Sequence, residues 1–162
     1  MTREEFARRI EDMQDVLYRV AYGLLLNPAD CADAAQECIF KAWRGIDALR
    51  DERYLQTWVI RILIHECYAI MRKRRSSLPL DEGMVAHRPA DSANEALCEA
   101  IAALPEKLRL VVVLHYIEGY KEAEVAQMLR CPLGTVKSRL RRARLQMRGL
   151  LAEEGRVCDA KA

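Results

Sequence analysis

The residues with the clearest chemistry lie near the C-terminus, between Cys131 and Arg148. This stretch contains six basic and no acidic residues. Guanidinium and ammonium groups bind phosphates, and arginine can also donate two hydrogen bonds to the edge of a guanine in the major groove. The stretch therefore predicts a DNA-binding surface rather than a merely solvated helix face. We expect its basic side chains to lie mostly on the outside of a helix, where they can contact phosphates and bases; they are Lys137, Arg139, Arg141, Arg142, Arg144 and Arg148.

A helix-turn-helix is the motif that would position these side chains. Residues 122–129 have helical spacing, and the sequence CPLG, 131–134, is typical of a turn. We expect a second helix from Thr135 to about Leu151. The side chains expected to pack inside it are Val136, Leu140, Ala143, Leu145 and Met147.

A second basic cluster ends an earlier helix. Residues 57–75 contain five basic residues and one acidic residue, and four of the basic ones are consecutive, Arg72 to Arg75. Basic residues at a helix C-terminus complement the helix dipole, but four in a row exceed what a cap requires. Apolar spacing predicts helices over 3–26, 31–46 and 54–75, the third so apolar that it should be the centre of a small bundle.

The helical pattern fails between Ser76 and Asp91, where two prolines, a glycine and acidic residues indicate a flexible linker. Ser92 and Glu95 have the spacing of a capping box that starts the next helix. A largely apolar helix then ends at Gly119. The fold class expected is therefore all-α, with two small helical domains over 1–75 and 92–152, a linker over 76–91 and a tail over 153–162.

Composition and residue spacing exclude several classes of protein. The N-terminus mixes both charges in an amphipathic pattern, so we expect a cytoplasmic protein without membrane insertion. The six cysteines occur singly, which favours buried, reduced thiols over disulfides. Because His65, His87 and His115 are isolated and no phosphate-binding glycine loop is present, we expect no enzyme, no cofactor and no metal. A metal site at His65 and Cys67 is disfavoured because residues two apart on a helix face different ways.

Three stretches together resemble a known family. They are DCADAAQECIFKAW (30–43), TWVIRILIHECYAIMRKRR (57–75) and EGYKEAEVAQMLRCPLGTVKSRLRRAR (118–144). In this order and spacing they are similar to the extracytoplasmic-function (ECF) group of bacterial RNA polymerase sigma factors, and the resemblance covers nearly the whole chain. A helix-turn-helix alone would be a weak signal, but the three motifs in combination are specific.

The resemblance implies roles for the first domain, which would be a sigma-2 domain. Its second helix would dock on the clamp coiled coil of the polymerase β′ subunit. The loop before Thr57 and the third helix would read and melt the minus-10 element, with Arg72, Lys73, Arg74 and Arg75 holding phosphates. Relatives often have asparagine where this chain has His65, so His65 either bonds a base or is a tolerated surface residue. The residues implied for core binding are Asp33, Gln36, Glu37, Phe40 and Trp43. The alternative for Phe40 and Trp43 is that they serve partly in the hydrophobic core of the domain.

The second domain would be sigma-4, and its helix-turn-helix would read the minus-35 element. Arg141 and Arg142 would read bases, and Arg139 and Arg144 would touch phosphate or pack. The residues implied for contact with minus-35 DNA are Thr135, Lys137, Ser138, Arg139, Arg141 and Arg142. The partners implied are the RNA polymerase core, through its β′ clamp and β flap, promoter DNA and an anti-sigma factor. The function implied is promoter recognition and transcription initiation. The alternative is a free-standing transcriptional regulator with an N-terminal helical sensor, which would bind an operator tightly without polymerase.

Overall fold

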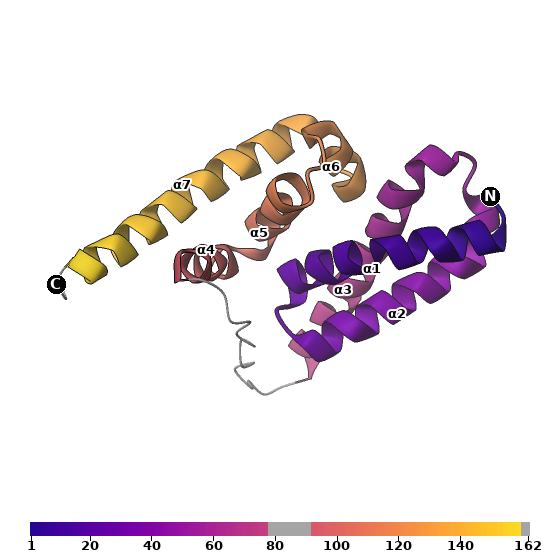
Figure 1. Ribbon diagram of the computed structural model, residues 1–162, viewed down its shortest axis with the longest axis horizontal. Helices are drawn as coiled ribbons and strands as arrows, with labels where there is room; N and C mark the ends of the chain where they lie inside the picture. The colour runs from indigo at the N-terminus through magenta and orange to yellow at the C-terminus, as the bar shows by residue number, and fades with distance from the viewer. Residues whose placement is uncertain (78–91, 160–162) are drawn as a thin grey trace. The chain divides into compact units, whose positions relative to one another are not determined.

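The computed structural model of the chain describes residues 1–77 and 92–159, with the side chains of 92–94 and 154–159 excepted. These residues form helices and connecting turns, and no strand occurs among them (Figure 1). The chain divides into two compact units. Helices α1, α2 and α3 form the first unit, and α4, α5, η3, most of α6 and α7 belong to the second. The predicted all-α, two-domain fold class is confirmed, whereas residues 78–91 of the predicted linker lie outside the described residues.

The first unit is built from α1 (Arg3–Leu25), α2 (Pro28–Gly45) and α3 (Leu55–Ser76), with two short 3₁₀ turns, η1 (Ile46–Ala48) and η2 (Glu52–Tyr54), before α3. Thr2 and Glu5 form a capping box at the start of α1, because the Glu5 amide donates to Thr2 Oγ1 and the Thr2 amide donates to Glu5 Oε2. Asn27 caps α2, and Pro28 occupies its first turn, so the helix begins three residues before the predicted start at Cys31.

The core of the first unit consists of the apolar stripe of each helix, and the three helices contact one another. Trp58 packs on α2, where a Cβ at Gly45 would lie 3.3 Å from its ring. Cys31, Cys38 and Cys67 are also buried there, and burial raises the pKa of the Cys31 thiol to about 11 and of the other two to about 12. The largest buried side chains of this core are Phe6, Leu17, Val20, Val59, Ile60 and Leu63.

The second unit contains α4 (Ser92–Ala102), α5 (Glu106–Val112), a π-helical segment η3 (Val113–Ile117), α6 (Glu122–Leu129) and α7 (Leu133–Asp159). Gly119 ends the apolar helix with φ 76°, as predicted for a left-handed cap. The core cluster is made by Leu104, Leu108, Val112 and Ala143, with Ile101 and Met147 packed against it. Arg109 is buried beside this core and donates to the carbonyls of Ala102 and Leu104, so it fastens the turn between α4 and α5.

Several predictions for the second unit were wrong. The turn of the helix-turn-helix is shorter than predicted, because α7 begins at Leu133, and α7 continues to Asp159 instead of ending at Leu151. Cys98 is exposed on α4, whereas all thiols were expected to be buried. The predicted capping box at Ser92 involves a side chain outside the described residues. No helix in the described part of the chain combines the length and apolarity needed to cross a bilayer.

Candidate nucleic-acid interface

The turn between α6 and α7 sets the direction of the basic helix. Arg130 adopts φ 50°, a left-handed conformation that ends α6, and the Cys131 amide donates to the Ala126 carbonyl at 3.1 Å. Pro132 then accepts from the Thr135 amide at 3.0 Å and starts α7. Buried Val125 and Ala126 on α6 complete the apolar side of the motif.

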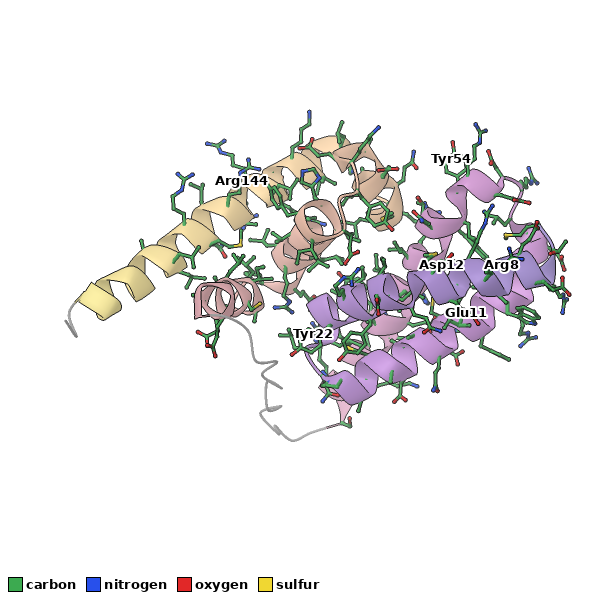
Figure 2. All side chains as sticks on the ribbon, viewed as in Figure 1. Arg8, Glu11, Asp12, Tyr22, Tyr54 and Arg144 are labelled. Carbon is green, nitrogen blue, oxygen red and sulfur yellow. The ribbon has the colours of Figure 1, made fainter. Side chains whose placement is uncertain are left out.

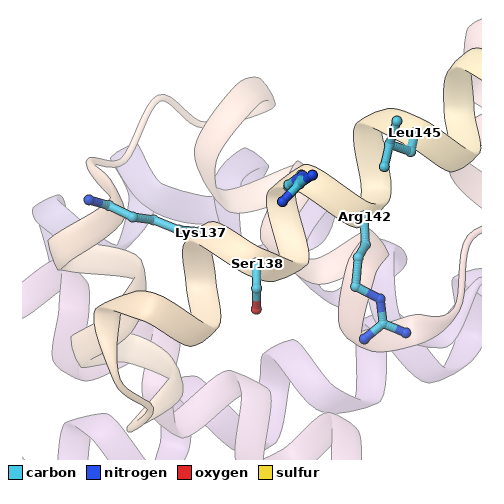
Figure 3. A pocket seen from close by; sticks show the side chains of 5 residues that line it. Lys137, Ser138, Arg142 and Leu145 are labelled. Carbon is cyan, nitrogen blue, oxygen red and sulfur yellow. The ribbon is translucent and has the colours of Figure 1, made fainter.

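The outward face of α7 carries the predicted DNA-contacting residues. The buried side chains Val136, Leu140 and Ala143 recur every three or four residues, which turns the opposite face toward solvent. Lys137, Ser138, Arg141 and Arg142 are all exposed there. Together with Leu145 they line a shallow, open groove of about 480 Å³, and Figure 3 shows these side chains along the helix, with Lys137, Ser138, Arg142 and Leu145 labelled.

Leu145 was predicted to pack, and that prediction was wrong, because its side chain is 56% exposed. Helical periodicity explains the error. Leu145 follows buried Ala143 by two residues, so its side chain points to a different side of the helix from the buried stripe. Met147 follows Ala143 by four residues and packs against the same core. The basic face of α7 therefore contains one large aliphatic side chain among its charged and polar residues.

The other basic and polar residues of this part of α7 are partly buried or form hydrogen bonds within the protein. Thr135 is half-buried, and its carbonyl accepts from Ser138 Oγ at 3.0 Å. Arg139 is also half-buried, in line with the prediction that it packs or touches phosphate at the edge. Arg144, labelled in Figure 2, donates to the hydroxyl of Tyr116 on η3 at 2.8 Å, so it lies toward η3 and away from the groove.

A second candidate face lies on α2. Asp33, Gln36, Glu37 and Phe40 are exposed, and their spacing of three and four residues puts them on one side of the helix. Phe40 is 54% exposed and has the Arg44 guanidinium 5.5 Å from its ring centroid. This face therefore combines acidic, amide and aromatic groups, which suits a charged protein partner.

Trp43 belongs largely to the core at the edge of this face. It is half-buried, its ring centroid lies 5.9 Å from that of Phe6, and the Arg3 guanidinium lies 5.3 Å from its own centroid. Of the five predicted core-binding residues, the structure therefore brings four together on an open surface. Trp43 contributes to this surface only the exposed edge of its ring.

His65 and the cluster Arg72–Arg75 are predicted minus-10 residues on α3. The side chain of His65 is 72% exposed, with Nδ1 3.3 Å from Glu66 Oε1. Arg74 forms an ion pair with Asp30 and donates to the Leu25 carbonyl at 3.3 Å, so it joins the end of α3 to the junction of α1 and α2. Arg74 therefore has a structural role that the sequence reasoning missed, whereas Arg72 and Lys73 are exposed at the helix end.

Glu66 and Lys41 are further residues that the sequence reasoning missed. Glu66 is buried, and its Oε1 forms an ion pair with Lys41 Nζ at 2.8 Å. Burial would raise the pKa of the Glu66 carboxyl, but the hydrogen bonds from Lys41 and His65 outweigh burial, and the pKa is lowered from its ordinary value. The available signal was that Glu66 is the one acid in an apolar and basic stretch, 57–75. Among the residues described, no cluster of histidine, cysteine and acidic side chains is suited to a metal ion.

Comparisons with known proteins cover both units. The family described as sigma-70 region 2 matches residues 9–77, and the family described as sigma-70, region 4 matches residues 94–147. The ECF RNA polymerase sigma-E factor of Escherichia coli (strain K12) is 30% identical over 134 residues, which is 71% of this chain and 70% of that protein. The ECF RNA polymerase sigma factor SigW of Bacillus subtilis (strain 168) is 29% identical over 170 residues, covering 93% of this chain and 91% of SigW.

Solved structures agree with these relatives. The sigma factor RpoE from Bartonella quintana, in complex with the anti-sigma factor NepR, superimposes with a TM-score of 0.82 at 27% identity, over 92% of this chain and 98% of that one. CnrH, in complex with the cytosolic domain of CnrY, has a TM-score of 0.72 at 22% identity, over 94% of this chain and 90% of that one, and supports the fold alone. The chain belongs to the ECF group of RNA polymerase sigma factors, and its function is to direct RNA polymerase to promoters for transcription initiation.

Proposed function

We propose that the two domains of this sigma factor divide promoter recognition between them. The domain at 1–75 binds core polymerase and opens the minus-10 element, and the domain at 92–152 binds the minus-35 element as duplex DNA. The observation that carries this proposal is the presence on one chain of an exposed polar face on α2 and an exposed basic face on α7. Neither face alone would distinguish a sigma factor from a simpler DNA-binding protein.

The core-binding surface is the exposed face of α2. Asp33, Gln36 and Glu37 supply acceptors and one amide donor, and Phe40 supplies an apolar contact beside them. Such a face suits the charged coiled coil of the β′ clamp, because complementary charges accelerate encounter and fix the register of two helices. Phe40 is the residue most suited to be buried by the partner, since more than half of its surface is exposed.

The minus-10 surface follows α3. His65 projects into solvent from the first half of the helix, and Arg72, Lys73 and Arg75 provide positive charge at its end. Single-stranded bases are held by pockets and stacking surfaces, while nearby cations neutralise their phosphates. Tyr54, labelled in Figure 2, is 52% exposed and supplies an aromatic surface immediately before the start of α3, at the opposite end of the helix from the basic cluster. Arg74 acts mainly by holding the end of α3 in place.

The minus-35 surface is the groove on α7. Arg141 and Arg142 carry the donors suited to guanine edges, and Lys137 lies where it can reach a phosphate. Ser138 is small enough to let the helix approach the bases closely. The same domain contacts the polymerase β flap, which holds it near the upstream part of the promoter.

The protein acts by binding rather than by catalysis, and its place of action is the cytoplasm, where bacterial RNA polymerase transcribes. The likeness to RpoE, which was solved with the anti-sigma factor NepR, supports an anti-sigma factor as a further partner of this chain. A free-standing regulator is not favoured, because matches to sigma-70 regions 2 and 4 cover both halves of the chain.

In vitro transcription with core polymerase and a randomised promoter library tests this proposal. We expect transcripts that depend on the chain, with two separated conserved blocks in the selected templates. Core without the chain is the control for residual transcription. Absence of transcripts from every template would reject the function, and transcripts with a minus-10 block alone would reject the division of recognition between the two domains.

A further inference from the structure

Leu145 is an exposed aliphatic side chain in the middle of a basic helix face. It follows Ser138 by seven residues, Arg141 by four and Arg142 by three, so these side chains share one side of α7. The groove that they line includes Leu145 as its apolar end. Gly149, four residues later, has nothing within 4 Å of the position of a Cβ, so the next turn leaves Leu145 uncovered.

The surroundings of Leu145 indicate the chemistry of its partner. The groove also contains Lys137, Arg141 and Arg142, which favour a polyanion over an apolar protein surface. Within the major groove of DNA, the one apolar group on a base edge is the 5-methyl of thymine. An aliphatic side chain placed between arginines on a helix that enters the major groove therefore has a matching partner.

We propose that Leu145 is a specificity-determining residue that contacts the 5-methyl group of a thymine in the minus-35 element. This inference rests on the proposed function of α7 as the minus-35 reader. Seven residues of helix span about 10 Å, so Leu145 lies about two helical turns farther along α7 than Ser138. Leu145 thus marks one edge of the element, and the arginines read its interior.

Replacement of thymine by uracil removes the 5-methyl group and leaves the hydrogen-bonding groups of the base unchanged. The experiment uses holoenzyme assembled from core and the full chain, on the promoter selected from the randomised library. Each thymine of the minus-35 region is replaced by uracil in turn, and equilibrium binding is measured by competition. We expect the wild-type holoenzyme to bind one of these templates about fourfold more weakly, as burial of one methyl group predicts.

Leu145→Ala should remove that difference and bind the thymine and uracil templates equally. Leu151→Ala is the matched control, because Leu151 is also on α7 and 37% exposed but faces another side of the helix. It should retain the wild-type preference for thymine. Arg142→Ala should weaken binding to both templates and keep their ratio.

The outcomes separate this inference from the function on which it rests. If the wild-type holoenzyme shows no sequence-specific binding to the minus-35 region, the proposed minus-35 role of α7 is rejected. Specific binding without sensitivity to uracil at any position, or a selected element without thymine, overturns the role of Leu145 alone. The same thymine preference in Leu145→Ala also overturns it. If Leu145→Ala weakens binding to core or to an anti-sigma factor and leaves the ratio unchanged, Leu145 is a protein contact and the proposal is wrong.

Discussion

Lys41 on α2 and Glu66 on α3 form an ion pair of 2.8 Å between Nζ and Oε1. Lys41 Nζ also lies 3.5 Å from Glu37, and Glu66 Oε1 lies 3.3 Å from His65 Nδ1. A chain of polar contacts therefore joins Glu37, a proposed core-binding residue, to His65, a proposed minus-10 residue. The ion pair of Lys41 with Glu66 links α2 to α3. It therefore helps to fix the position of the proposed core-binding surface on α2 relative to the proposed minus-10 surface on α3.

Glu66→Gln should destabilise the first domain at neutral pH. The substitution keeps the shape of the side chain and removes a buried charge paired with a half-exposed lysine, so we expect a loss of about 1–2 kcal/mol. Both tryptophans, Trp43 and Trp58, lie in the first unit, and their fluorescence in a urea titration reports its unfolding. Glu37→Gln, at the exposed end of the same contacts, should change the free energy of unfolding by no more than about 0.5 kcal/mol.

The effect of Glu66→Gln should depend on pH. Because folding lowers the pKa of Glu66, its charge contributes stability above the ordinary glutamate pKa of about 4.3, and this contribution is lost as the pH falls through the lower folded value. The difference between wild type and variant should therefore shrink between about pH 5 and pH 3. A difference that is constant over this range would mean that Glu66 acts through packing.

Replacing Asp33, Gln36 and Glu37 together by alanine should abolish core binding and leave the fold intact. All three are exposed, so their removal costs the fold little. Binding to purified core, measured by size-exclusion chromatography or pull-down, should be lost. The matched control replaces Glu11, Gln14 and Asp15, which are exposed on α1 and, like the first set, carry two negative charges and one amide. Equal retention of core by both triple variants would place the core-binding surface elsewhere.

The sequence predicted the helices well because apolar spacing and caps are local signals. Asn27 and Pro28 mark the junction of α1 and α2, and Gly119 takes the left-handed conformation expected of it. Contacts between helices were not predictable in the same way. The ion pair of Lys41 with Glu66 joins positions 25 residues apart, and the pair of Arg74 with Asp30 joins positions 44 residues apart.

The error at Leu145 has a different origin. An aliphatic residue near a helical stripe was assigned to the core from its type, although its phase on the helix placed it outside. Residue type was a poor predictor of burial at Leu145, because an exposed binding surface can include an aliphatic side chain. Phe40 and Cys98 are also exposed, although phenylalanine and cysteine are usually buried. The exposure of Arg141 and Arg142 was predictable, because a charged side chain on the face opposite a buried apolar stripe points into solvent.

Arg74 and Arg72 should respond differently to substitution by alanine. Arg74→Ala removes the ion pair with Asp30 and the hydrogen bond to the Leu25 carbonyl, so the first domain should lose about 1–2 kcal/mol in the tryptophan-monitored urea titration. Arg72→Ala, at an exposed position, should leave stability nearly unchanged and weaken holoenzyme binding to minus-10 DNA in a salt-dependent way. Equal stability losses in both variants would show that Arg74 has no special structural role.

The cysteines should differ in reactivity toward iodoacetamide. At pH 8 the buried thiols of Cys31, Cys38 and Cys67 remain protonated, because burial raises their pKa values to about 11, 12 and 12, and the thiolate is the reacting form. Cys98 is exposed and should be modified first, as peptide mass spectrometry can resolve. In urea the three buried thiols should react as well. Rapid modification of Cys38 in the native protein would contradict the burial of this cluster.

Arg142→Ala and Arg148→Ala should have distinct effects on minus-35 binding, although both remove one exposed arginine from α7. Arg142 lines the groove, so its loss should reduce discrimination between matched and mutated minus-35 sites by about 1–3 kcal/mol. Arg148 lies outside the groove residues, so its loss should weaken binding about equally on all sequences and reduce the salt slope by about 1. Holoenzyme competition assays at several salt concentrations measure both quantities. Identical losses on matched and mutated sites for both variants would mean that Arg142, like Arg148, contacts the phosphate backbone and does not read bases.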